Sequence, residues 1–279
     1  MTSQDIPAPD AFALEWREYD EPDAAHQRWT TWWDVEPLCR GPEPRPDWVI
    51  TDRAAIDTEL GVLKTGKEAD VFLLERAVPG GKPVVMAAKR YRDPEHRDFH
   101  RNAAYTEGRR GRDSREGRAL SKGSTFGKAV ASGRWANAEW ESLKRCWEVG
   151  LPVPYPVQID GTEILMEWIS YDGETAPRLA RTRPAPELLT AWFEQLREAL
   201  ALMAQQGIVH GDLSAYNILA VGDRLVIIDL PQIVDLVGNP NGMDFLLRDC
   251  ANVCAWFRSK GLVDADEQEL FTDVLSTAF

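Results

Sequence analysis

The stretch GIVHGDLSAYNILAVGDRLVIIDL, residues 207–230, carries the pattern from which both the fold and the chemistry of this chain are predicted. It contains a carboxylate at Asp212, an amide at Asn217 and a second carboxylate at Asp229, where an apolar run ends. Phosphoryl transfer uses one carboxylate to accept the proton of the attacking hydroxyl, and an amide and another carboxylate to hold Mg²⁺ on the phosphates. The pattern therefore predicts Asp212 as the catalytic carboxylate, with Asn217 and Asp229 as metal ligands.

The residues between Asn217 and Asp229 predict a β-hairpin. The apolar runs NILAV and RLVIID are joined by Gly222-Asp223, a pair typical of two-residue hairpin turns. Folding at this turn brings Asn217 and Asp229 to the open end of the hairpin, on strands about 4.8 Å apart. Ideal pairing sets Asn217 opposite Ile228, so the chain must twist beside one of the two residues if both are to share a metal.

A purely structural interpretation of this stretch is the alternative. Asp212 would then cap a turn, Asp229 would end a strand, and His210 would be a packed histidine that supports the loop backbone. The second carboxylate at a suitable distance favours the catalytic interpretation for the two aspartates. For His210 the structural interpretation is preferred, because the motif places Asp212 better as the base.

Several ordered segments resemble one protein family. HGDLSAYN and the following IIDLPQ resemble the catalytic and metal loops of the RIO-type atypical serine/threonine protein kinases, nearest the RIO1 branch. Upstream, LKTGKEADVF resembles their phosphate loop and WANAEWESL the start of their C helix, and MDFLLRDCANVCAWF resembles the helix after the metal loop. Ordinary protein kinases match less well, because His-Gly-Asp and Asp-Leu-Pro replace their His-Arg-Asp and Asp-Phe-Gly. The resemblance covers about residues 56–262.

The resemblance implies an α+β, bilobal protein-kinase-like fold with a truncated C-lobe. Only fifty residues follow Asp229, which leaves no room for a full substrate-binding lobe. We expect a RIO-kinase-like domain over residues 51–279, with its N-lobe at 51–165 and its C-lobe at 166–279. Residues 1–50 are rich in Trp, Pro and acid, and are predicted to form a partly ordered arm whose tryptophans pack on the main body. A partner-docking segment is the alternative for this arm.

The resemblance also implies residues that bind ATP. Lys89 ends the apolar run VVMAAK, and is expected to neutralise the phosphates and to pair with Glu139 of the C helix. A solvated lysine and an exposed helix glutamate are the alternatives, but the small apolar residues before Lys89 favour a buried approach. Backbone groups of Glu167 and Ile169 are expected to bind the adenine ring.

The four residues Gly66, Lys67, Glu68 and Ala69 lie between two predicted strands. A turn with small residues can cover phosphates through its backbone N–H groups, so these four are predicted to bind the cofactor. An ordinary hairpin is the alternative. Asp70 departs from the resemblance, which has a neutral polar residue there, and its charge is expected to weaken nucleotide binding.

The composition of the chain argues against several other kinds of function. Its 279 residues are 44% hydrophobic and 28% charged, as in globular proteins, and the net charge of −13 argues against general affinity for nucleic acid or anionic membranes. No apolar run approaches the roughly 20 residues of a membrane helix, and the N-terminus lacks a signal-peptide pattern. The four cysteines match no zinc pattern and are expected to be free thiols, so a cytoplasmic location is predicted.

A basic segment interrupts the kinase-like pattern. Residues 89–128 hold twelve basic and six acidic residues and few large apolar ones. Such a segment cannot bury enough surface to offset its ordering entropy, so a flexible insert at 90–128 is predicted, where trypsin should cut first. In the family that the chain resembles, this loop tends to carry autophosphorylated serines, and Ser114, Ser121 and Ser124 are available here. A solvated linker is the alternative.

These observations predict ATP-dependent phosphoryl transfer, with Mg²⁺ or Mn²⁺, to serine or threonine of an unknown protein substrate, including autophosphorylation. Phosphotransfer to a small molecule stays open, because aminoglycoside-type kinases also carry an HGD-x-x-x-x-N loop. An ATP-gated binding or scaffold protein stays open too. RIO-like proteins are associated with ribosome assembly, so ribosomal or assembly components are candidate partners. Some of these proteins act through an aspartyl-phosphate, which would form here on Asp229.

Overall fold

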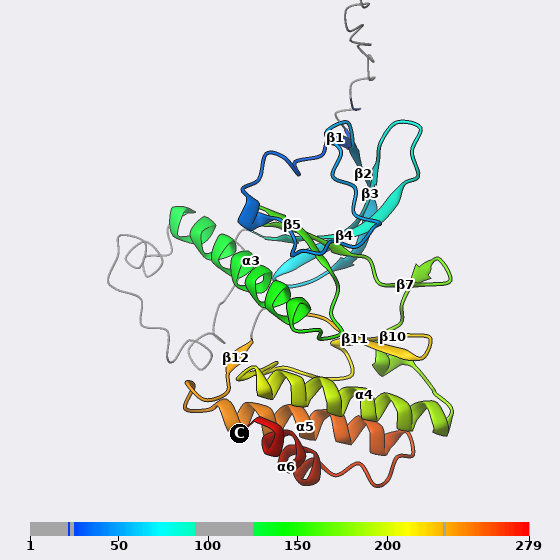
Figure 1. The fold of residues 1–279 in the computed structure, drawn as a ribbon, viewed down its shortest axis with the longest axis vertical. Helices are drawn as coiled ribbons and strands as arrows, with labels where there is room; N and C mark the ends of the chain where they lie inside the picture. The colour runs from blue at the N-terminus through cyan, green and yellow to red at the C-terminus, as the bar shows by residue number, and fades with distance from the viewer. Residues whose placement is uncertain (1–21, 23–24, 93–124, 231–232, 279) are drawn as a thin grey trace, which may run out of the picture.

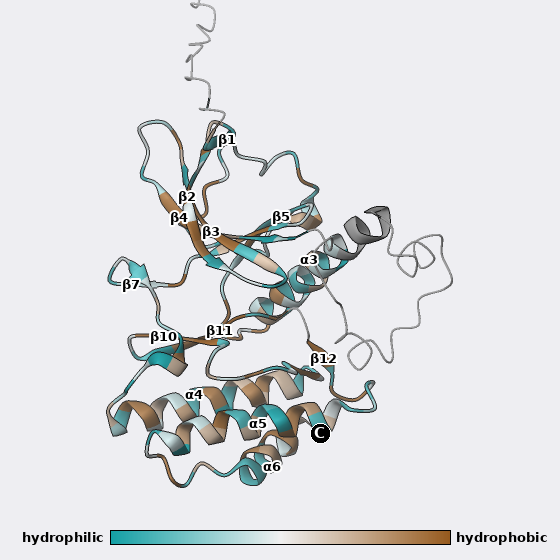
Figure 2. Cartoon of the chain, turned by 180° about the vertical axis from the view of Figure 1, so that it is seen from behind, coloured by the Kyte–Doolittle hydropathy of each residue, from teal (hydrophilic) through white to brown (hydrophobic). Residues whose placement is uncertain are grey.

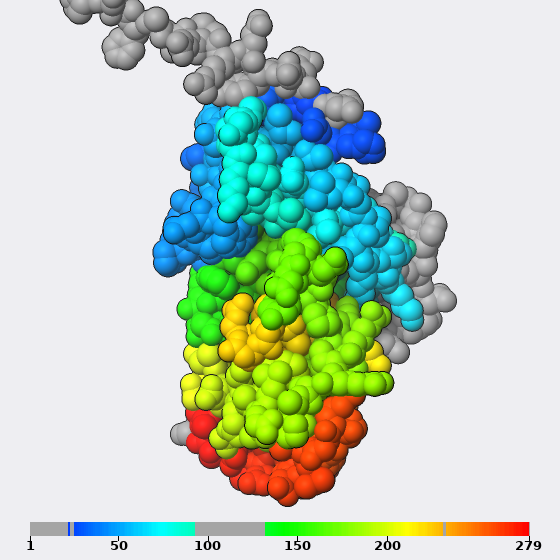
Figure 3. Space-filling model, turned by 90° about the vertical axis from the view of Figure 1, so that its right-hand side faces the viewer, coloured from blue at the N-terminus to red at the C-terminus, as the bar shows by residue number. Residues whose placement is uncertain are grey.

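A six-stranded sheet and a group of helices form the two lobes of this computed structural model (Figure 1). The structure describes residues 22, 25–92, 125–230 and 233–278. Viewed from the side, the N-lobe in blue and cyan lies above the C-lobe in yellow to red, with the green residues between them (Figure 3). The bilobal α+β fold predicted from the sequence is confirmed.

The N-lobe is built on an antiparallel sheet with the strand order β1-β2-β3-β4-β6-β5. Its strands are β1 (Gln27–Trp29), β2 (Ile56–Thr65), β3 (Ala69–Ala77), β4 (Val84–Tyr91), β5 (Pro156–Asp160) and β6 (Glu163–Glu167). In the middle of β4, Ala87 and Ala88 are both buried although their side chains point to opposite faces. This strand is therefore covered on both sides, which fits the small apolar residues that precede Lys89.

Helix α3 (Thr125–Glu148) packs against this sheet. Trp140 and Ala136 of the helix form a buried cluster with Tyr91 of β4 and Ile164 of β6. The helix thus holds its polar residues at a fixed place beside the end of β4, where Lys89 lies.

The predicted insert at 90–128 overlaps both of its neighbouring elements. Strand β4 continues to residue 91, and α3 already begins at residue 125. The sequence by itself predicts helical periodicity only from Trp135 to Val149. Glycine and serine have low helix propensity, so they conceal the first turns of α3 in the sequence. The remaining segment, with the predicted tryptic sites and serines, lies outside the described residues.

The N-terminal segment belongs to the N-lobe over the part that the structure describes. Strand β1 pairs with β2, with Gln27 opposite Thr58. The side chain of Trp32 is 1% exposed and lies in a core cluster with Tyr155. The domain boundary predicted between residues 50 and 51 therefore cuts through the sheet, because the tryptophans bury apolar surface that the later strands leave uncovered.

Three helices form most of the C-lobe: α4 (Pro186–Gln205), α5 (Gly242–Ser259) and α6 (Glu267–Ala278). The sequence predicts helical regions at 187–206, where apolar residues repeat every three or four positions, and at about 243–260 and 264–277, and the observed helices match them. Brown and teal residues alternate along α4 and α5, as expected of helices with one buried face (Figure 2). Gly207 ends α4 with a φ of 68°, a conformation that glycine adopts without strain.

Short elements complete the fold and carry the loops of the site. They are η1 (Pro37–Cys39), β7 (Ser170–Tyr171), β8 (Glu174–Thr175), η3 (Leu179–Arg181), β9 (Ile208–Val209), β10 (Ile218–Val221), β11 (Arg224–Ile227) and β12 (Val234–Asp235). All four cysteines are free. Within the described ranges, every helix is too short or too polar to cross a membrane.

Candidate active site

The predicted hairpin forms and ends in a twist at Asp229. Strands β10 and β11 pair with Ile218 opposite Ile227, and the Ile228 N–H donates to the carbonyl of Asn217 at 2.9 Å. Asn217 therefore lies opposite Ile228, as ideal pairing requires. The next residue, Asp229, has a φ of 67°, which costs a residue with a Cβ atom about 1–2 kcal/mol. The twist that the sequence required thus lies at the end of the second strand, and such strain is concentrated at functional sites.

The loop before the hairpin holds Asp212 and Asn217 in fixed relation. The Asn217 Nδ2 donates to the Asp212 carbonyl at 2.9 Å, so the Oδ1 of Asn217 is the side-chain oxygen that a metal would use. The carboxylate of Asp212 is on the surface, where an acceptor hydroxyl can reach it. This arrangement gives the loop one exposed carboxylate and one oriented amide.

Lys89 connects three parts of the fold at one point. Its Nζ donates to Glu139 Oε1 on α3 at 2.7 Å and to Asp229 Oδ1 after β11 at 3.0 Å. The other oxygen of Glu139 accepts a hydrogen bond from the Tyr91 hydroxyl. The lysine and glutamate side chains are 13% and 4% exposed, whereas that of Asp229 is 43% exposed. The sequence motifs therefore come together as a buried ion pair that faces a more accessible carboxylate.

The charges of this cluster stabilise one another. Burial would lower the pKa of Lys89, but the Glu139 and Asp229 carboxylates raise it above its ordinary value. Burial would likewise raise the pKa of Asp229, but Lys89 lowers it. Lys89 is therefore protonated and Asp229 ionised at neutral pH, which are the states needed to bind phosphate and a divalent cation.

His210 has the structural role preferred for it. The side chain is 1% exposed, its Nε2 donates to the Ile228 carbonyl at 3.3 Å, and its Nδ1 accepts from the Asp212 N–H at 3.3 Å. These contacts define the tautomer with the proton on Nε2. The histidine thus connects the catalytic loop at Asp212 to the end of the hairpin, next to Asp229.

Asp249 on α5 is a site residue that sequence reasoning missed. It is fully buried, and its two carboxylate oxygens accept from the Gly211 and Leu213 N–H groups, each at 2.8 Å. It therefore holds the residues on both sides of Asp212. A signal was present in the sequence: Asp249 lies three residues after Leu246 and four before Val253, in the apolar stripe of the helix. A charged residue in such a stripe is buried and needs partners.

We expect Asp249→Asn to lower the free energy of unfolding by about 1–3 kcal/mol, because an amide nitrogen would replace one acceptor and leave a buried N–H unsatisfied. Phosphoryl transfer should fall as well, since the loop around Asp212 loses its anchor. Urea unfolding measures the first effect, with Asp244→Asn on the exposed face of α5 as the matched control. Equal stability of Asp249→Asn and the wild type would show that the carboxylate is not needed to hold the loop.

The predicted phosphate loop forms a tight turn between β2 and β3. The Gly66 N–H donates to the Ala69 carbonyl at 3.0 Å and to Asp70 Oδ1 at 3.3 Å, while Lys67 and Glu68 are exposed. In the described conformation the Gly66 N–H is thus used within the protein, and a phosphate would have to compete for it.

Asp70 does not point toward Lys89. Lys89 pairs with Val71, whereas Asp70 pairs with Arg90, and adjacent residues of a strand point to opposite faces. The Asp70 carboxylate forms a bidentate ion pair with Arg92 on that opposite face, with Arg92 Nε 2.5 Å from Oδ2. The expectation that its charge weakens nucleotide binding is therefore not supported, because the charge is neutralised and directed away from the lysine.

Lys64 is a second cation that the sequence analysis did not assign. It lies opposite Val71, which lies opposite Lys89, so Lys64 and Lys89 are on the same face of the sheet. Burial, Arg178 and Lys89 lower the pKa of Lys64, against the opposing effect of Asp229. Arg178 in turn donates to the Tyr216 carbonyl in the catalytic loop. Lys64 thus lies near Asp229, and Arg178 from the other lobe lies near Lys64.

The predicted adenine-binding residues lie at the end of β6, where Glu167 is the last residue, and just after it, at Ile169. The Glu167 N–H donates to the Tyr155 carbonyl at 2.8 Å, and the Ile169 carbonyl accepts from the Ala176 N–H at 3.0 Å. An adenine ring would therefore use the other backbone group of each residue, the Glu167 carbonyl and the Ile169 N–H. Glu167 is half-buried, burial raises the pKa of its carboxyl, and its Oε2 accepts from the Tyr155 N–H at 3.1 Å.

A metal at this site would need ligands from a nucleotide. Within the described part of the chain, no three His, Cys, Asp or Glu side chains lie close enough to hold a metal. Asn217 Oδ1 and the Asp229 carboxylate are hard oxygen donors of the kind that Mg²⁺ prefers, and Mg²⁺ is commonly held by one or two protein ligands plus phosphates. The residues present therefore fit a Mg²⁺ bound together with phosphate.

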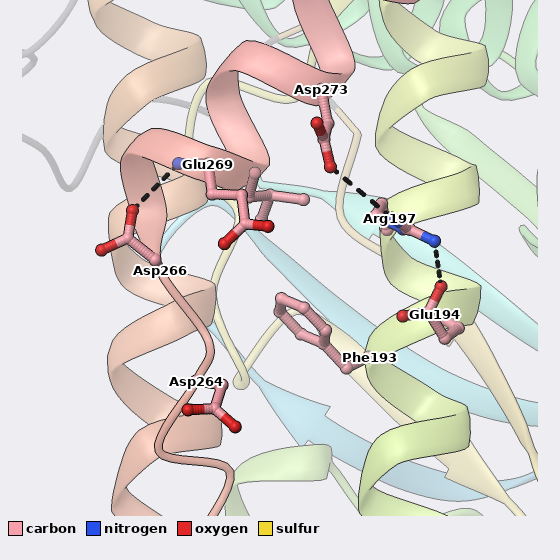
Figure 4. Close-up of a pocket in the computed structure, with 8 residues that line it drawn as sticks. Phe193, Glu194, Arg197, Asp264, Asp266, Glu269 and Asp273 are labelled. Atoms are coloured by element: carbon pink, nitrogen blue, oxygen red, sulfur yellow. Dashed lines mark hydrogen bonds and ion pairs between the residues drawn. The ribbon is translucent and has the colours of Figure 1, made fainter.

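A separate hollow lies between α4 and α6 and is not part of this site (Figure 4). It has a volume of about 120 Å³, and Arg197 lies at its wall 3.5 Å from Asp273 and also paired with Glu194. The lining residues are Phe193, Glu194, Arg197, Asp264, Asp266, Glu269, Leu270 and Asp273. None of them is among the predicted site residues.

Comparisons with known proteins agree with the motifs and the fold. The model of the RIO domain matches residues 81–270. The RIO-type serine/threonine-protein kinase Rio1 of Haloferax volcanii is 35% identical over 216 residues, which are 77% of this chain and 68% of that protein. The serine/threonine-protein kinase RIO3 of Mus musculus is 29% identical over 81% of this chain, but over only 43% of its own length.

A solved structure shows the same fold. The Rio2 kinase-ADP/Mg²⁺-phosphoaspartate complex from Chaetomium thermophilum superposes with a TM-score of 0.56 at 22% identity, and the match covers 78% of this chain and 62% of that one. The family model spans most of the chain and includes Lys89, Glu139 and the 207–230 stretch. This chain therefore belongs to the RIO family of serine/threonine-protein kinases, close to its Rio1 members.

Proposed function

We propose that this protein transfers the γ-phosphoryl group of ATP to serine or threonine hydroxyls of a protein, its own chain included. The observation that carries the proposal is the contact of Lys89 with both Glu139 and Asp229. Through this contact the sheet, α3 and the end of the hairpin meet beside the Asp212 loop. The exposed Asp212 and the oriented amide of Asn217 then supply the remaining groups of a phosphoryl-transfer site.

Each residue has a distinct task in this proposal. Asp212 orients the acceptor hydroxyl and accepts its proton, while Lys89 binds the phosphates and is held in place by Glu139. Asn217 and Asp229 would hold Mg²⁺ or Mn²⁺, which when bound neutralises the charge of the phosphate oxygens. Most of the rate enhancement would come from positioning and from preorganised charge.

Other backbone and side-chain groups would fix the nucleotide. Backbone groups of the Gly66–Ala69 turn would lie over the phosphates, with the side chain of Lys67 exposed beside them. The Glu167 carbonyl and the Ile169 N–H would bind the adenine edge. The Gly66 N–H is used within the turn, so the other backbone N–H groups of the turn would meet the phosphates.

An aspartyl-phosphate cycle is the second candidate, and one observation favours it. The Chaetomium Rio2 kinase was crystallised as an ADP/Mg²⁺-phosphoaspartate complex. In this chain Asp229 is the corresponding candidate by motif, and its side chain is 43% exposed. Under this proposal Asp229 would attack the γ-phosphorus, and hydrolysis would reset an ATP-driven switch.

The substrate and the partners of this protein are proposed from the family resemblance. A protein substrate is preferred over an aminoglycoside-type small molecule, because the matching relatives are named protein kinases. Ribosomal or assembly components are the proposed partners, and the cytoplasm is the proposed location. ATP consumption that rises with aminoglycosides, and not with protein acceptors, would favour the small-molecule alternative.

Binding of Mg²⁺-ATP tests the proposed function directly. We expect titration calorimetry to give one site per chain, and the melting temperature to rise, because the ligand binds only the folded state. Lys89→Met should weaken binding, whereas Lys82→Met, which changes an exposed lysine just before β4, should not. Absence of binding by the wild type with either Mg²⁺ or Mn²⁺ would contradict the kinase proposal.

A further inference from the structure

Arg92 joins the phosphate loop to helix α3. Its backbone N–H donates to the Glu68 carbonyl at 3.0 Å, and its carbonyl accepts from the Ser132 hydroxyl at 2.9 Å. Ser132 is 5% exposed and lies on α3. The backbone of this one residue thus touches the predicted phosphate-binding turn on one side and the helix that carries Glu139 on the other.

The side chain of Arg92 makes a second connection to the same turn. Its guanidinium forms a bidentate pair with Asp70, whose Oδ1 also accepts the Gly66 N–H at 3.3 Å. A continuous series of contacts therefore runs from Gly66 through Asp70 and Arg92 to Ser132. From Ser132 the helix reaches Glu139 in seven residues, or about 10 Å along its axis.

We propose that Asp70 and Arg92 are positioning residues that hold the phosphate loop at a fixed place relative to α3, and so set the affinity for ATP. This proposal rests on the proposed function, because it needs ATP to bind beneath the loop. Neither side chain touches the reacting atoms. Asp70 points to the face opposite Lys89, so the pair acts through the position of Gly66 and not through a contact with phosphate.

The geometry explains why this ion pair matters more than an ordinary surface pair. Exposed pairs usually contribute little, since solvent screens them and two long side chains must be ordered. Here Asp70 is short, 19% exposed and also bound to the Gly66 N–H, while the Arg92 side chain, 42% exposed, extends from a backbone that is held on both sides. A bidentate pair adds geometric specificity, and it loses less entropy when the carboxylate and the backbone of the arginine are already held.

Hydrogen exchange of the nucleotide-free protein tests the connection without ATP. We expect Arg92→Ala and Asp70→Ala to speed exchange of the amides between residues 66 and 71, with the C-lobe unchanged. Glu59→Gln is the matched control, because it removes the Arg90–Glu59 pair on the same sheet without touching the turn. Exchange in the turn that is equal in Arg92→Ala, Asp70→Ala and the wild type would overturn the proposal.

Nucleotide affinity and rate test the positioning role. Each single variant should bind Mg²⁺-ATP about fivefold more weakly, with transfer at saturating ATP within about twofold of wild type, as expected when only uniform binding is lost. The double variant should be no weaker than Asp70→Ala, because the Arg92 side chain acts through Asp70. Arg92→Lys keeps the charge but not the bidentate geometry, and should fall between wild type and Arg92→Ala.

The outcomes separate this proposal from the proposed function. Wild-type affinity in Arg92→Ala and Asp70→Ala, or losses that add in the double variant, would overturn the positioning role while the kinase proposal stands. A lower rate at saturating ATP with unchanged affinity would overturn it as well. Failure of the wild type to bind Mg²⁺-ATP would overturn both, whatever the exchange data show.

Discussion

Replacing Asp212 by Asn is expected to lower phosphoryl transfer by about 10²–10⁴-fold, the usual effect of losing a general base. The carboxylate is exposed and takes no part in the Lys89 cluster, so Mg²⁺-ATP should still bind with wild-type affinity. The Asp212 backbone groups that meet His210 and Asn217 are unchanged by the substitution, so the loop should keep its shape. Transfer from γ-labelled ATP and calorimetry measure the two properties separately.

Asp223→Asn is the matched control for this variant. It makes the same chemical change at an exposed position of the same hairpin, where Asn is also a good turn residue. We expect it to retain wild-type transfer. If Asp212→Asn transfers phosphate as fast as this control does, Asp212 is not the base.

Asp229→Asn should impair binding and chemistry together. The change removes a charged oxygen donor for the metal and one of the two carboxylates that hold Lys89. Even the loss of an outer-shell partner commonly weakens metal binding by about 10–100-fold, so at least a tenfold loss of Mg²⁺-dependent ATP affinity is expected. Asparagine tolerates the φ of 67° at this position, so the fold should be retained.

Calorimetry with Mg²⁺-ATP and with ATP in EDTA checks the Asp229 prediction. The affinity difference between these two conditions should be large in the wild type and small in Asp229→Asn. Asp264→Asn, far along the chain in the loop before α6, is the control for a general change of charge. If the ATP affinity of Asp229→Asn depends on Mg²⁺ as strongly as that of the wild type, Asp229 is not a ligand of the metal.

The elements nearest the catalytic loop could be predicted well from the sequence. The turn pair Gly222-Asp223 and the apolar runs beside it determine the hairpin. The regular apolar stripe of α4 determines the length of that helix. The pairing of Lys89 with Glu139 followed from family motifs, because fifty residues of chain, including the basic segment, separate the two. Local periodicity contains no information about a contact over such a distance.

Other features depend on tertiary contacts that the sequence does not display. The Asp249 contact to the catalytic loop spans 36 and 38 residues, and only its place in an apolar stripe hinted at burial. Strand β1 lies in a segment rich in Pro and acid, whose composition resembles that of a loop. The neutralisation of Asp70 by Arg92 required the register of β3 and β4, which sets the face of each side chain.

Label transfer from γ-³²P-ATP, followed by hydroxylamine treatment, tests the central claim most directly. For transfer to hydroxyl groups, the wild type should give label on serine or threonine that resists hydroxylamine, and both Asp212→Asn and Asp229→Asn should lose it. Label that is hydroxylamine-labile and lost in Asp229→Asn would instead identify the aspartyl-phosphate cycle. Wild-type transfer by both variants would contradict the assignment of the active site to residues 207–230.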